Sequence, residues 1–449
     1  MTPDKTPSGG RPPNGHPSFG EASRFWLKLG FISFGGPTGQ IAIMHAELVE
    51  KRRWISEARF LHALNYCMLL PGPEAQQLAT YVGWLLHRTW GGVVAGALFV
   101  IPSMFLLWAL SLVYVTFGAV PWVAAIFYGL KPAVLAIVAA AVIRIGGKAL
   151  KNEVMWTLAA LSFVAIYFFK VPFPLIIVAA ALIGFVGGQV RRDKFLVIRG
   201  HGPKSGAGET TVIGDDVAAA EHTRPTLGRA LRVCATWLGL WWAPVAVLAL
   251  WLGTGHTLFR EAIFFSKAAM VTFGGAYAVL PYVSQQAVET HGWLTAPQML
   301  DGLGLAETTP GPLIMVLQFV GFLGAWNHPG TLSPLTAATL GAAITTWATF
   351  LPCFIWIFLG APHVERLREQ PRLTAALSSI TAAIVGVILN LAVWFGWHVL
   401  HPVPGRFDAF AAVIAVVAFI GIVRWKWNVI AVVVGSALAG WLAHLLIGI

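Results

Sequence analysis

The chain contains one stretch twice. Residues 25–73 recur at 264–312 without a gap, so each residue of the first copy has a counterpart 239 positions later. Thirteen of the 49 positions are identical, and the identities include Gly, Pro, Trp and Lys as well as apolar residues. Each copy interrupts an apolar run twice, first at Phe-Gly-Gly and then at Pro-Gly-Pro. Glycine and proline both break helices, and paired broken helices in two halves of a chain are typical of transporter binding sites.

Composition places the chain in a membrane. It is 57% hydrophobic and 11% charged, with a mean hydropathy of +0.73. Soluble proteins carry about twice that charge. The net charge of +11 fits Lys and Arg in cytoplasmic loops that face anionic lipid, so no nucleic-acid partner is expected. We find no phosphate-binding loop, nucleophile motif or His/Cys ligand cluster, so the sequence predicts no enzyme, metal site or cofactor.

The apolar segments predict an all-α polytopic fold in two halves. Thirteen segments are found, at about 24–45, 57–86, 90–117, 121–146, 154–170, 172–190, 233–253, 260–284, 295–326, 334–360, 373–399, 407–423 and 427–447. Six segments, then one, then six make two inverted repeats joined by one extra transmembrane helix. The expected domains are a disordered tail (1–20), a first repeat (24–190), a cytoplasmic linker (191–231), the connecting helix (233–253) and a second repeat (260–449).

The distribution of Lys and Arg predicts the orientation. With the N-terminus in the cytoplasm, most basic loops also fall there, and the C-terminus is periplasmic. The basic residues 51–53 would lie on the periplasmic side, against this rule, if segment 24–45 crosses the membrane fully. The alternative is that the first two segments of each repeat are re-entrant and return to the side on which they began. Both arrangements stay open at the level of sequence.

The breaks predict an anion site. Pro37 and Pro73 suit the first position of a new helix, and free N–H groups at a helix start attract anions. The predicted substrate-binding residues are Lys28, Ser33, Gly35, Gly36, Thr38, Gly72, Gln76, Gln77, Lys267, Thr272, Gly274, Gly275, Thr308, Thr309 and Gly311. The competing interpretation is that the breaks are hinges or packing kinks, and that the lysines extend to the membrane surface.

Two acids near the breaks are not repeated. Glu74 stands opposite Leu313, and Glu307 stands opposite Met68. We therefore predict that the shared residues form the scaffold and that Glu74 and Glu307 couple transport to protons. For Glu74 a simpler explanation exists, because an acid in the first turn of a helix is favoured by the helix dipole.

The motifs resemble those of the chromate ion transporter family in its long, two-domain form. The residues that carry the likeness are Phe34-Gly35-Gly36-Pro37, Trp54, Pro71-Gly72-Pro73, Gln76, Tyr81 and Gly83, then Phe273-Gly274-Gly275-Ala276-Tyr277, Trp293 and Pro310-Gly311-Pro312. The resemblance implies a secondary transporter of the bacterial inner membrane that exports chromate and gives chromate resistance. Chromate, protons and the lipid bilayer are the expected partners, and a homodimer stays open.

Three alternatives remain. A carrier of sulfate or another oxyanion has the same requirements as a chromate carrier, and a passive anion channel also fits duplicated broken helices. A membrane enzyme acting on a lipid or quinone needs a cluster of His, Asp or Cys that the sequence does not contain. Export itself is favoured physically, because moving a dianion out through about 100 mV gains roughly 4.6 kcal/mol.

Overall fold

The protein is built from helices. The structure, a computed structural model, describes residues 15–34, 36–197, 211–213, 226–363, 371–403 and 405–447. Over these ranges the chain forms helices and two isolated β-bridges, with no longer strand. Most of the predicted tail and linker lies outside the described residues. The all-α prediction is confirmed.

The helices follow the predicted apolar segments closely. In the first half they are α1 (Phe19–Ile32), α2 (Gly36–His45), the π-helical turn η1 (Ala46–Lys51), α3 (Glu57–Cys67), α4 (Glu74–Phe117), α5 (Pro121–Ala149), α6 (Glu153–Tyr167), α7 (Phe173–Val190) and α8 (Arg192–Phe195). Within α4 the backbone is non-helical at His87 and Arg88, which is where the sequence predicts two separate segments.

The second half begins with α9 (Leu227–Leu252), the predicted connecting helix. The elements after it are α10 (Thr257–Met270), α11 (Ala276–Ser284), the π-helical turn η3 (Gln285–Thr290), α12 (Ala296–Thr308), the 3₁₀ turn η4 (Leu313–Met315), α13 (Val316–Asn327), α14 (Pro334–Gly360), the 3₁₀ turn η5 (Ala361–His363), α16 (Pro371–Leu400), α17 (Ala409–Arg424) and α18 (Val429–Ile447).

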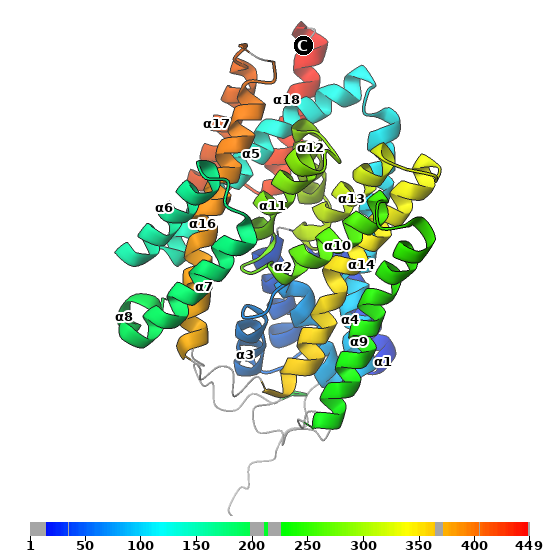
Figure 1. Cartoon of the computed structure of the whole chain (residues 1–449), viewed down its shortest axis with the longest axis vertical. Coiled ribbons are helices and arrows are strands. Elements are labelled where there is room, and N and C mark those ends of the chain that lie inside the picture. Colours follow the sequence, from blue (N-terminus) through cyan, green and yellow to red (C-terminus); the bar gives the residue numbers. More distant parts are fainter. Residues whose placement is uncertain are drawn as a thin grey trace, which may run out of the picture.

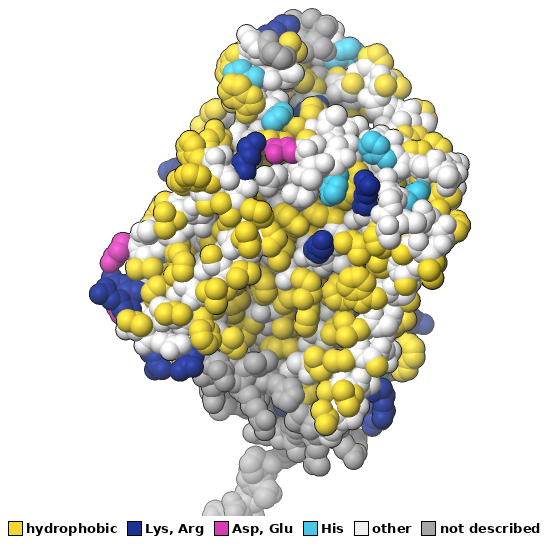
Figure 2. Space-filling view, viewed as in Figure 1, with side chains coloured by type: hydrophobic (Ala, Val, Ile, Leu, Met, Phe, Trp, Pro, Cys, Tyr) yellow, Lys and Arg dark blue, Asp and Glu magenta, His cyan; other side chains and the backbone are white. Residues whose placement is uncertain are grey.

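Within the described residues, seven helices are long and apolar enough to cross a membrane. They are α4, α5, α7, α9, α14, α16 and α18, and shorter apolar helices cover α6, α17 and residues 313–327. A broad band of hydrophobic side chains crosses the middle of the face in Figure 2, and Lys and Arg gather along its lower left margin. Such a belt is what contact with lipid requires.

Local geometry recurs at the sequence offset. The turns η1 and η3 begin and end 239 residues apart, as do the ends of α2 and α11. In each turn region the Trp amide caps the same carbonyl: Trp54 N donates to Leu48 O, and Trp293 N to Ala287 O, both at 2.8 Å. Because π-helical turns are rare and often mark functional sites, their repetition is informative.

The two broken segments of the first half both return to the end of the molecule where α1 begins. Glu21 in the first turn of α1 lies 3.6 Å from Arg52, and the Phe25 and Trp54 rings are 5.2 Å apart. The kink in α4 lies there too, with His87 Nε2 2.9 Å from Pro17 O. The same end holds residue 213, whose carbonyl accepts from Ser56 N.

The broken segments of the second half also return to a common end, as those of the first half do. The Phe264 ring of α10 lies 5.5 Å from Trp293, which follows η3. At the end of α13, Asn327 Nδ2 donates to Trp293 O (2.8 Å). Thus each half contains two hairpins whose tips are the Gly-Gly and Pro-Gly-Pro breaks. In the view of Figure 1, α2 and α11 lie centrally, between α16 on one side and α14 with α9 on the other.

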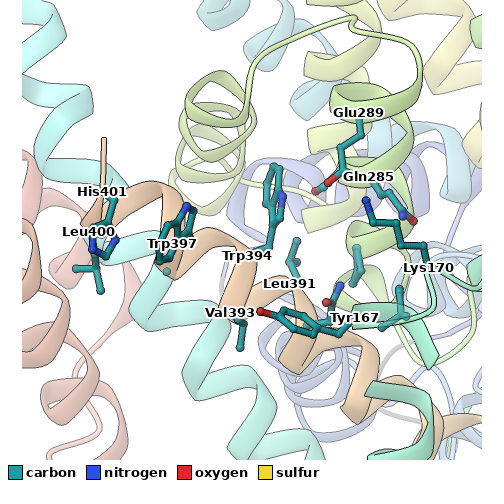
Figure 3. Close-up of a pocket in the computed structure, with 15 residues that line it drawn as sticks. Tyr167, Lys170, Gln285, Glu289, Leu391, Val393, Trp394, Trp397, Leu400 and His401 are labelled. Carbon is teal, nitrogen blue, oxygen red and sulfur yellow. The ribbon is translucent and has the colours of Figure 1, made fainter. Parts of the chain in front are cut away.

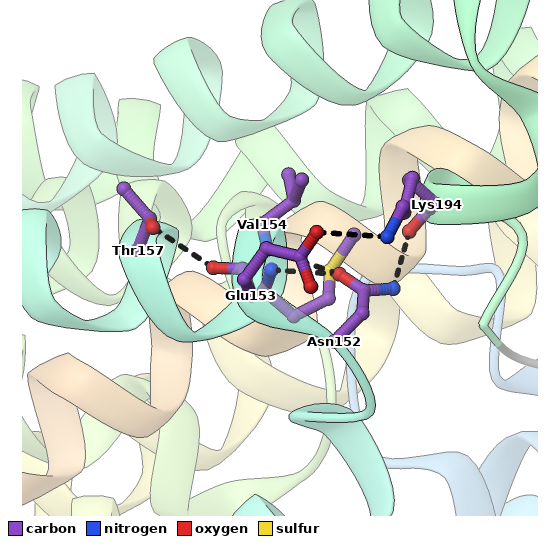
Figure 4. Close-up of polar contacts among 6 residues, drawn as sticks. Asn152, Glu153, Val154, Thr157 and Lys194 are labelled. Carbon is purple, nitrogen blue, oxygen red and sulfur yellow. Dashed lines mark hydrogen bonds and ion pairs between the residues drawn. The ribbon is translucent and has the colours of Figure 1, made fainter.

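The start of α6 is fixed by a polar cluster (Figure 4). Asn152 Oδ1 accepts from the amides of Val154 and Met155, and its Nδ2 donates to Lys194 O at 2.7 Å. Lys194 Nζ donates to Glu153 Oε1 (2.8 Å), and this hydrogen bond raises the pKa of Lys194. A raised lysine pKa means that the contact is present at neutral pH and is lost only as the pH rises through that pKa.

Candidate functional site

The four breaks meet at the centre through two equivalent hydrogen bonds. Gly72 N donates to Thr272 O, and Gly311 N donates to Ser33 O, each at 2.7 Å. Gly72 and Gly311 are counterparts at the offset of 239, and so are Ser33 and Thr272. Each Pro-Gly-Pro tip is therefore bonded to the Gly-Gly tip of the other half, and the amides of Gly72 and Gly311 are not free for a ligand.

Backbone conformation explains why the tips contain glycine. Positive φ angles occur at Gly36 (67°), Gly72 (118°), Gly274 (76°), Gly275 (90°) and Gly311 (102°). Side chains with a Cβ rarely adopt these values, so a substitution here strains the backbone. Gly35, predicted as a substrate-binding residue, lies outside the described residues.

The tips are also closely packed. A Cβ on Gly311 would lie 2.4 Å from the Ser103 side chain, and a Cβ on Gly72 would lie 2.8 Å from Cys353 Sγ. A Cβ on Gly275 would lie 3.8 Å from the Pro37 ring, so the two Gly-Gly tips are neighbours as well.

Two of the helices that start at the tips lack side-chain caps. α4 begins after Pro73 and α11 after Gly275, and neither has a side chain that accepts from its first amides. By contrast, helices elsewhere in the described chain are capped, by Ser18, Ser56, Asn152, Thr226, His256, Thr295, Ser333, Asp408 and Asn428. α5 and α7 also lack such a cap, and proline occupies their first turns. Uncapped starts leave amide donors for another acceptor.

The helix starts differ from the expected positions in two places. Pro73 is the N-cap of α4 rather than its first residue, and Pro37 is the second residue of α2. At the fourth break, residues 313–315 form the 3₁₀ turn η4 before α13 begins. The tight turn after Pro312 uses the amide of Met315 in an i→i+3 bond to Pro312 O, as Ala278 N does with Gly275 O at the start of α11.

Among the predicted side chains, Ser33 lies at the tips and has a hydroxyl group that is available to a ligand. Ser33 is fully buried and its Oγ has no hydrogen-bond partner among the described residues. Gln76 and Gln77 are buried in the first turn of α4, with Nε2 donating to Phe350 O (3.5 Å) and Pro71 O (2.8 Å). Their Oε1 atoms have no partner in the described chain. A hydroxyl can donate to an oxyanion, whereas an amide oxygen can only accept.

The predicted threonine hydroxyls are already bonded within their own helices. Thr272 Oγ1 donates to Ala268 O (2.7 Å), Thr308 Oγ1 to Leu305 O (2.8 Å) and Thr309 Oγ1 to Ala306 O (3.2 Å). Thr38 is part of α2, and its side chain lies outside the described residues.

The two repeated lysines lie at the surface. Lys28 and Lys267 are both exposed. The charge of Lys28 acts on Glu47, in the turn η1 at the opposite end of the hairpin. Their role as substrate ligands stays a prediction, and the geometry favours the surface position that the sequence left as the alternative.

The acids lie beside the tips and face cations of α5. Glu307 is buried (7% exposed) and its Oε1 accepts from the hydroxyl of Tyr277, the second residue of α11. The Arg144 guanidinium lies 5.8 Å from the Tyr277 ring centroid and acts electrostatically on Glu307. Glu74 is also buried, and Lys148 acts electrostatically on it.

Sequence reasoning missed several of these partners. It interpreted Arg144 and Lys148 only as markers of the cytoplasmic side. It also missed the Gln40 side chain, whose Nε2 donates to Gly311 O at 2.5 Å. Asp301 is a weaker polar candidate in the sequence, and its partners were not foreseen: it accepts from Tyr114 (2.9 Å) and lies 3.7 Å from Lys131. The available signal was the comparison of copies, because Gln40 stands opposite Val279 and Asp301 opposite His62.

A cavity of about 530 Å³ opens at the far end of α11 (Figure 3). Lys170, Gln285 and Glu289 line one side of it, and Tyr167, Trp394 and Trp397 line another. Ser284 also lines it, is 2% exposed and has an Oγ without a partner in the described chain. No group of three His, Cys, Asp or Glu in the described ranges is placed to hold a metal ion.

Comparison with known proteins decides the family. The chromate transporter family model matches residues 20–185 and 259–441, the two halves that carry the hairpins. The chain belongs to the chromate transporter family. It is 32% identical to a chromate transport protein of Pseudomonas aeruginosa over 98% of this chain and 95% of that one. No solved structure matches it.

Two further relatives extend the likeness. A chromate transport protein of Cupriavidus metallidurans is 28% identical over 94% of this chain and 92% of its own length. A probable chromate transport protein of Synechococcus elongatus is 28% identical over 87% and 88%. Membership of the chromate transporter family, together with the apolar helices, makes this a multi-pass membrane protein and a transporter rather than an enzyme.

Proposed function

We propose that the protein is a secondary transporter that exports chromate from the bacterial cytoplasm through the inner membrane and so gives chromate resistance. The observation that carries the proposal is the pair of hydrogen bonds from Gly72 to Thr272 and from Gly311 to Ser33. They bring two uncapped helix starts, two buried acids and one unpaired hydroxyl to one central place, where broken helices of transporters bind their substrates.

The two halves, residues 24–190 and 260–449, are in this proposal inverted repeats joined by α9. The four hairpin segments are re-entrant, and the nine remaining segments cross the membrane: the second part of α4, then α5, α6, α7, α9, α14, α16, α17 and α18. This count puts the N-terminus in the cytoplasm and the C-terminus in the periplasm. It is supported by the contact of residues 51–56 with residue 213 of the basic linker, because both then lie on the cytoplasmic side.

Electrostatics sets the direction. Export of a dianion along a potential of about 100 mV, negative inside, gains roughly 4.6 kcal/mol. Uptake must overcome the same amount and needs at least two coupled cations. Glu74 and Glu307 are the groups we assign to proton coupling, because they are buried acids beside the tips.

The test is flux in proteoliposomes of the purified protein. Chromate on the cytoplasmic face should move against its electrochemical gradient when an opposing proton gradient is imposed and the membrane potential is clamped at zero, and sulfate should compete. Flux that only dissipates a gradient indicates a channel. Sulfate transport without chromate transport indicates a sulfate carrier, and cells expressing the protein should then gain no resistance to chromate.

A further inference from the structure

The strongest unassigned feature is a pair of cations on α5. Arg144 and Lys148 are one helical turn apart, so they share a face of the helix. Both are exposed, whereas Ala141 and Ala149 on either side are buried. The inference below rests on the proposed function and names the residues that bind its substrate.

Arg144 contacts one tip directly, and the charge of Lys148, one turn along the same face, acts on another. Arg144 lies over Tyr277, the second residue of α11, which starts at the Gly-Gly break of the second half. Lys148 acts on Glu74, the first residue of α4, which starts at the Pro-Gly-Pro break of the first half. One face of α5 therefore carries both cations, and two helix starts at the tips, those of α11 and α4, have no side-chain cap.

A third element of the site is Ser33. Its side chain is fully buried at the tips, and its Oγ has no partner among the described residues. A buried donor without an acceptor is costly unless a ligand or water supplies one. The hydroxyl, the two helix starts and the two cations all favour negative charge.

We propose that Arg144 and Lys148 form the cationic face of the oxyanion site and bind a tetrahedral dianion between the starts of α11 and α4. Glu307 and Glu74 balance the charge of the two cations while the site is empty of substrate. The planar guanidinium contacts two oxygens of the dianion at once, and the ammonium contacts a third. Because both cations are exposed, the dianion reaches them from the end of α5 that we place in the cytoplasm.

Lys151 provides the matched control. It follows the same helix, carries the same charge as Lys148 and is exposed, but it donates only to Gly147 O, next to its own helix end. A charge that serves only orientation in the membrane is expected to behave like Lys151.

The experiment is equilibrium dialysis of radiolabelled chromate, and separately sulfate, with the purified full-length protein in nanodiscs. Arg144→Gln should raise Kd about tenfold or more, and Lys148→Gln about fivefold, because each loses a charged hydrogen bond. Arg144→Lys should give an intermediate Kd. Lys151→Gln should leave Kd within about twofold of the unsubstituted protein. Thermal unfolding without ligand checks that each variant is folded.

The outcomes separate this inference from the proposed function. If the unsubstituted protein binds neither anion, the proposed function fails. If it binds chromate and Arg144→Gln binds it equally well in the folded state, the site assignment is wrong and the function stands. Equal losses in the Lys148 and Lys151 variants would mean that Lys148 contributes only to the general surface charge.

Discussion

The two halves have the same backbone at their tips and different chemistry around them. Both make the same crossed hydrogen bond, the same π-helical turn and the same Trp cap. Yet His45 in the first half is within 3.2 Å of Glu50 and also contacts Glu57, whereas its counterpart Ser284 has an unpaired hydroxyl in an open cavity. The difference shows that the duplication preserved the backbone scaffold. The last position of α2 and of α11, by contrast, has charged neighbours at His45 in the first half and a cavity at Ser284 in the second.

The largest expected effect comes from filling the tips. Gly311→Ala and Gly72→Ala both force a Cβ into a positive-φ position and should destabilise the protein by about 2–5 kcal/mol. Gly147→Ala is the control, because nothing lies within 4 Å of its Cβ. Thermal unfolding measures all three.

A second substitution distinguishes the two tips. The added Cβ at position 72 meets Cys353 Sγ, which Cys353→Ala removes, whereas the one at position 311 meets Ser103 Cβ, which Ser103→Ala retains. Partial rescue is therefore expected only at Gly72. Rescue at both tips, or at neither, would show that the close contacts do not set the cost.

The next largest effect is expected at Glu307 and Glu74, the two acids that the halves do not share. Glu307→Gln keeps an acceptor for the Tyr277 hydroxyl but cannot ionise, so it should flatten the pH dependence of chromate transport while the protein stays folded. Transport rates of proteoliposomes between about pH 6 and 8 measure this, with Glu74→Gln as the parallel variant. A pH profile unchanged in the Glu307 variant would remove its proton role.

The paired hydroxyls should differ in function. Ser33→Ala removes a donor that has no protein partner, so the Kd for chromate should rise about five- to tenfold with little change in stability. Thr272→Val removes a hydroxyl already bonded to Ala268 O and should change Kd by less than twofold. A larger loss of chromate affinity in the Thr272 variant than in the Ser33 variant would mean that Thr272, and not Ser33, donates to the substrate.

The smallest effects are expected at the caps of α6 and α17. Asn152→Ala should cost about 1 kcal/mol because two amides lose their acceptor. Asp408→Ala should cost a similar amount, since Asp408 caps α17 and also accepts from Tyr128 (2.7 Å), as Asn152 also donates to Lys194 O. Unfolding midpoints at neutral pH compare the two, and a Tyr128→Phe variant with an unchanged midpoint would mean that the Tyr128 bond contributes nothing.

The fold could be predicted because apolar length and helix-breaking residues act locally. The segment bounds and the hairpin tips at Gly72 and Gly311 follow from such local signals. The direction in which a side chain points does not follow from local signals. Lys28 and Lys267 are repeated and lie near the breaks in sequence, yet the helix turns both to the surface.

The partners of the acids could not be predicted for a related reason. Arg144 and Glu307 are 163 residues apart, and only the packing of α5 against α12 brings them together. Thr272 resembles Ser33 in sequence, but its hydroxyl turns back to its own helix. Sequence comparison indicates where a site lies, and tertiary packing selects the side chains that serve it.

The crossed bond from Gly72 to Thr272 also has a consequence for biosynthesis. Its acceptor is made 200 residues after its donor. At about 5–20 residues per second the ribosome needs roughly 10–40 seconds to supply it. During that time the amide of Gly72 lacks its acceptor. The first pair of hairpins therefore stays incompletely packed until the second half has been synthesised and inserted.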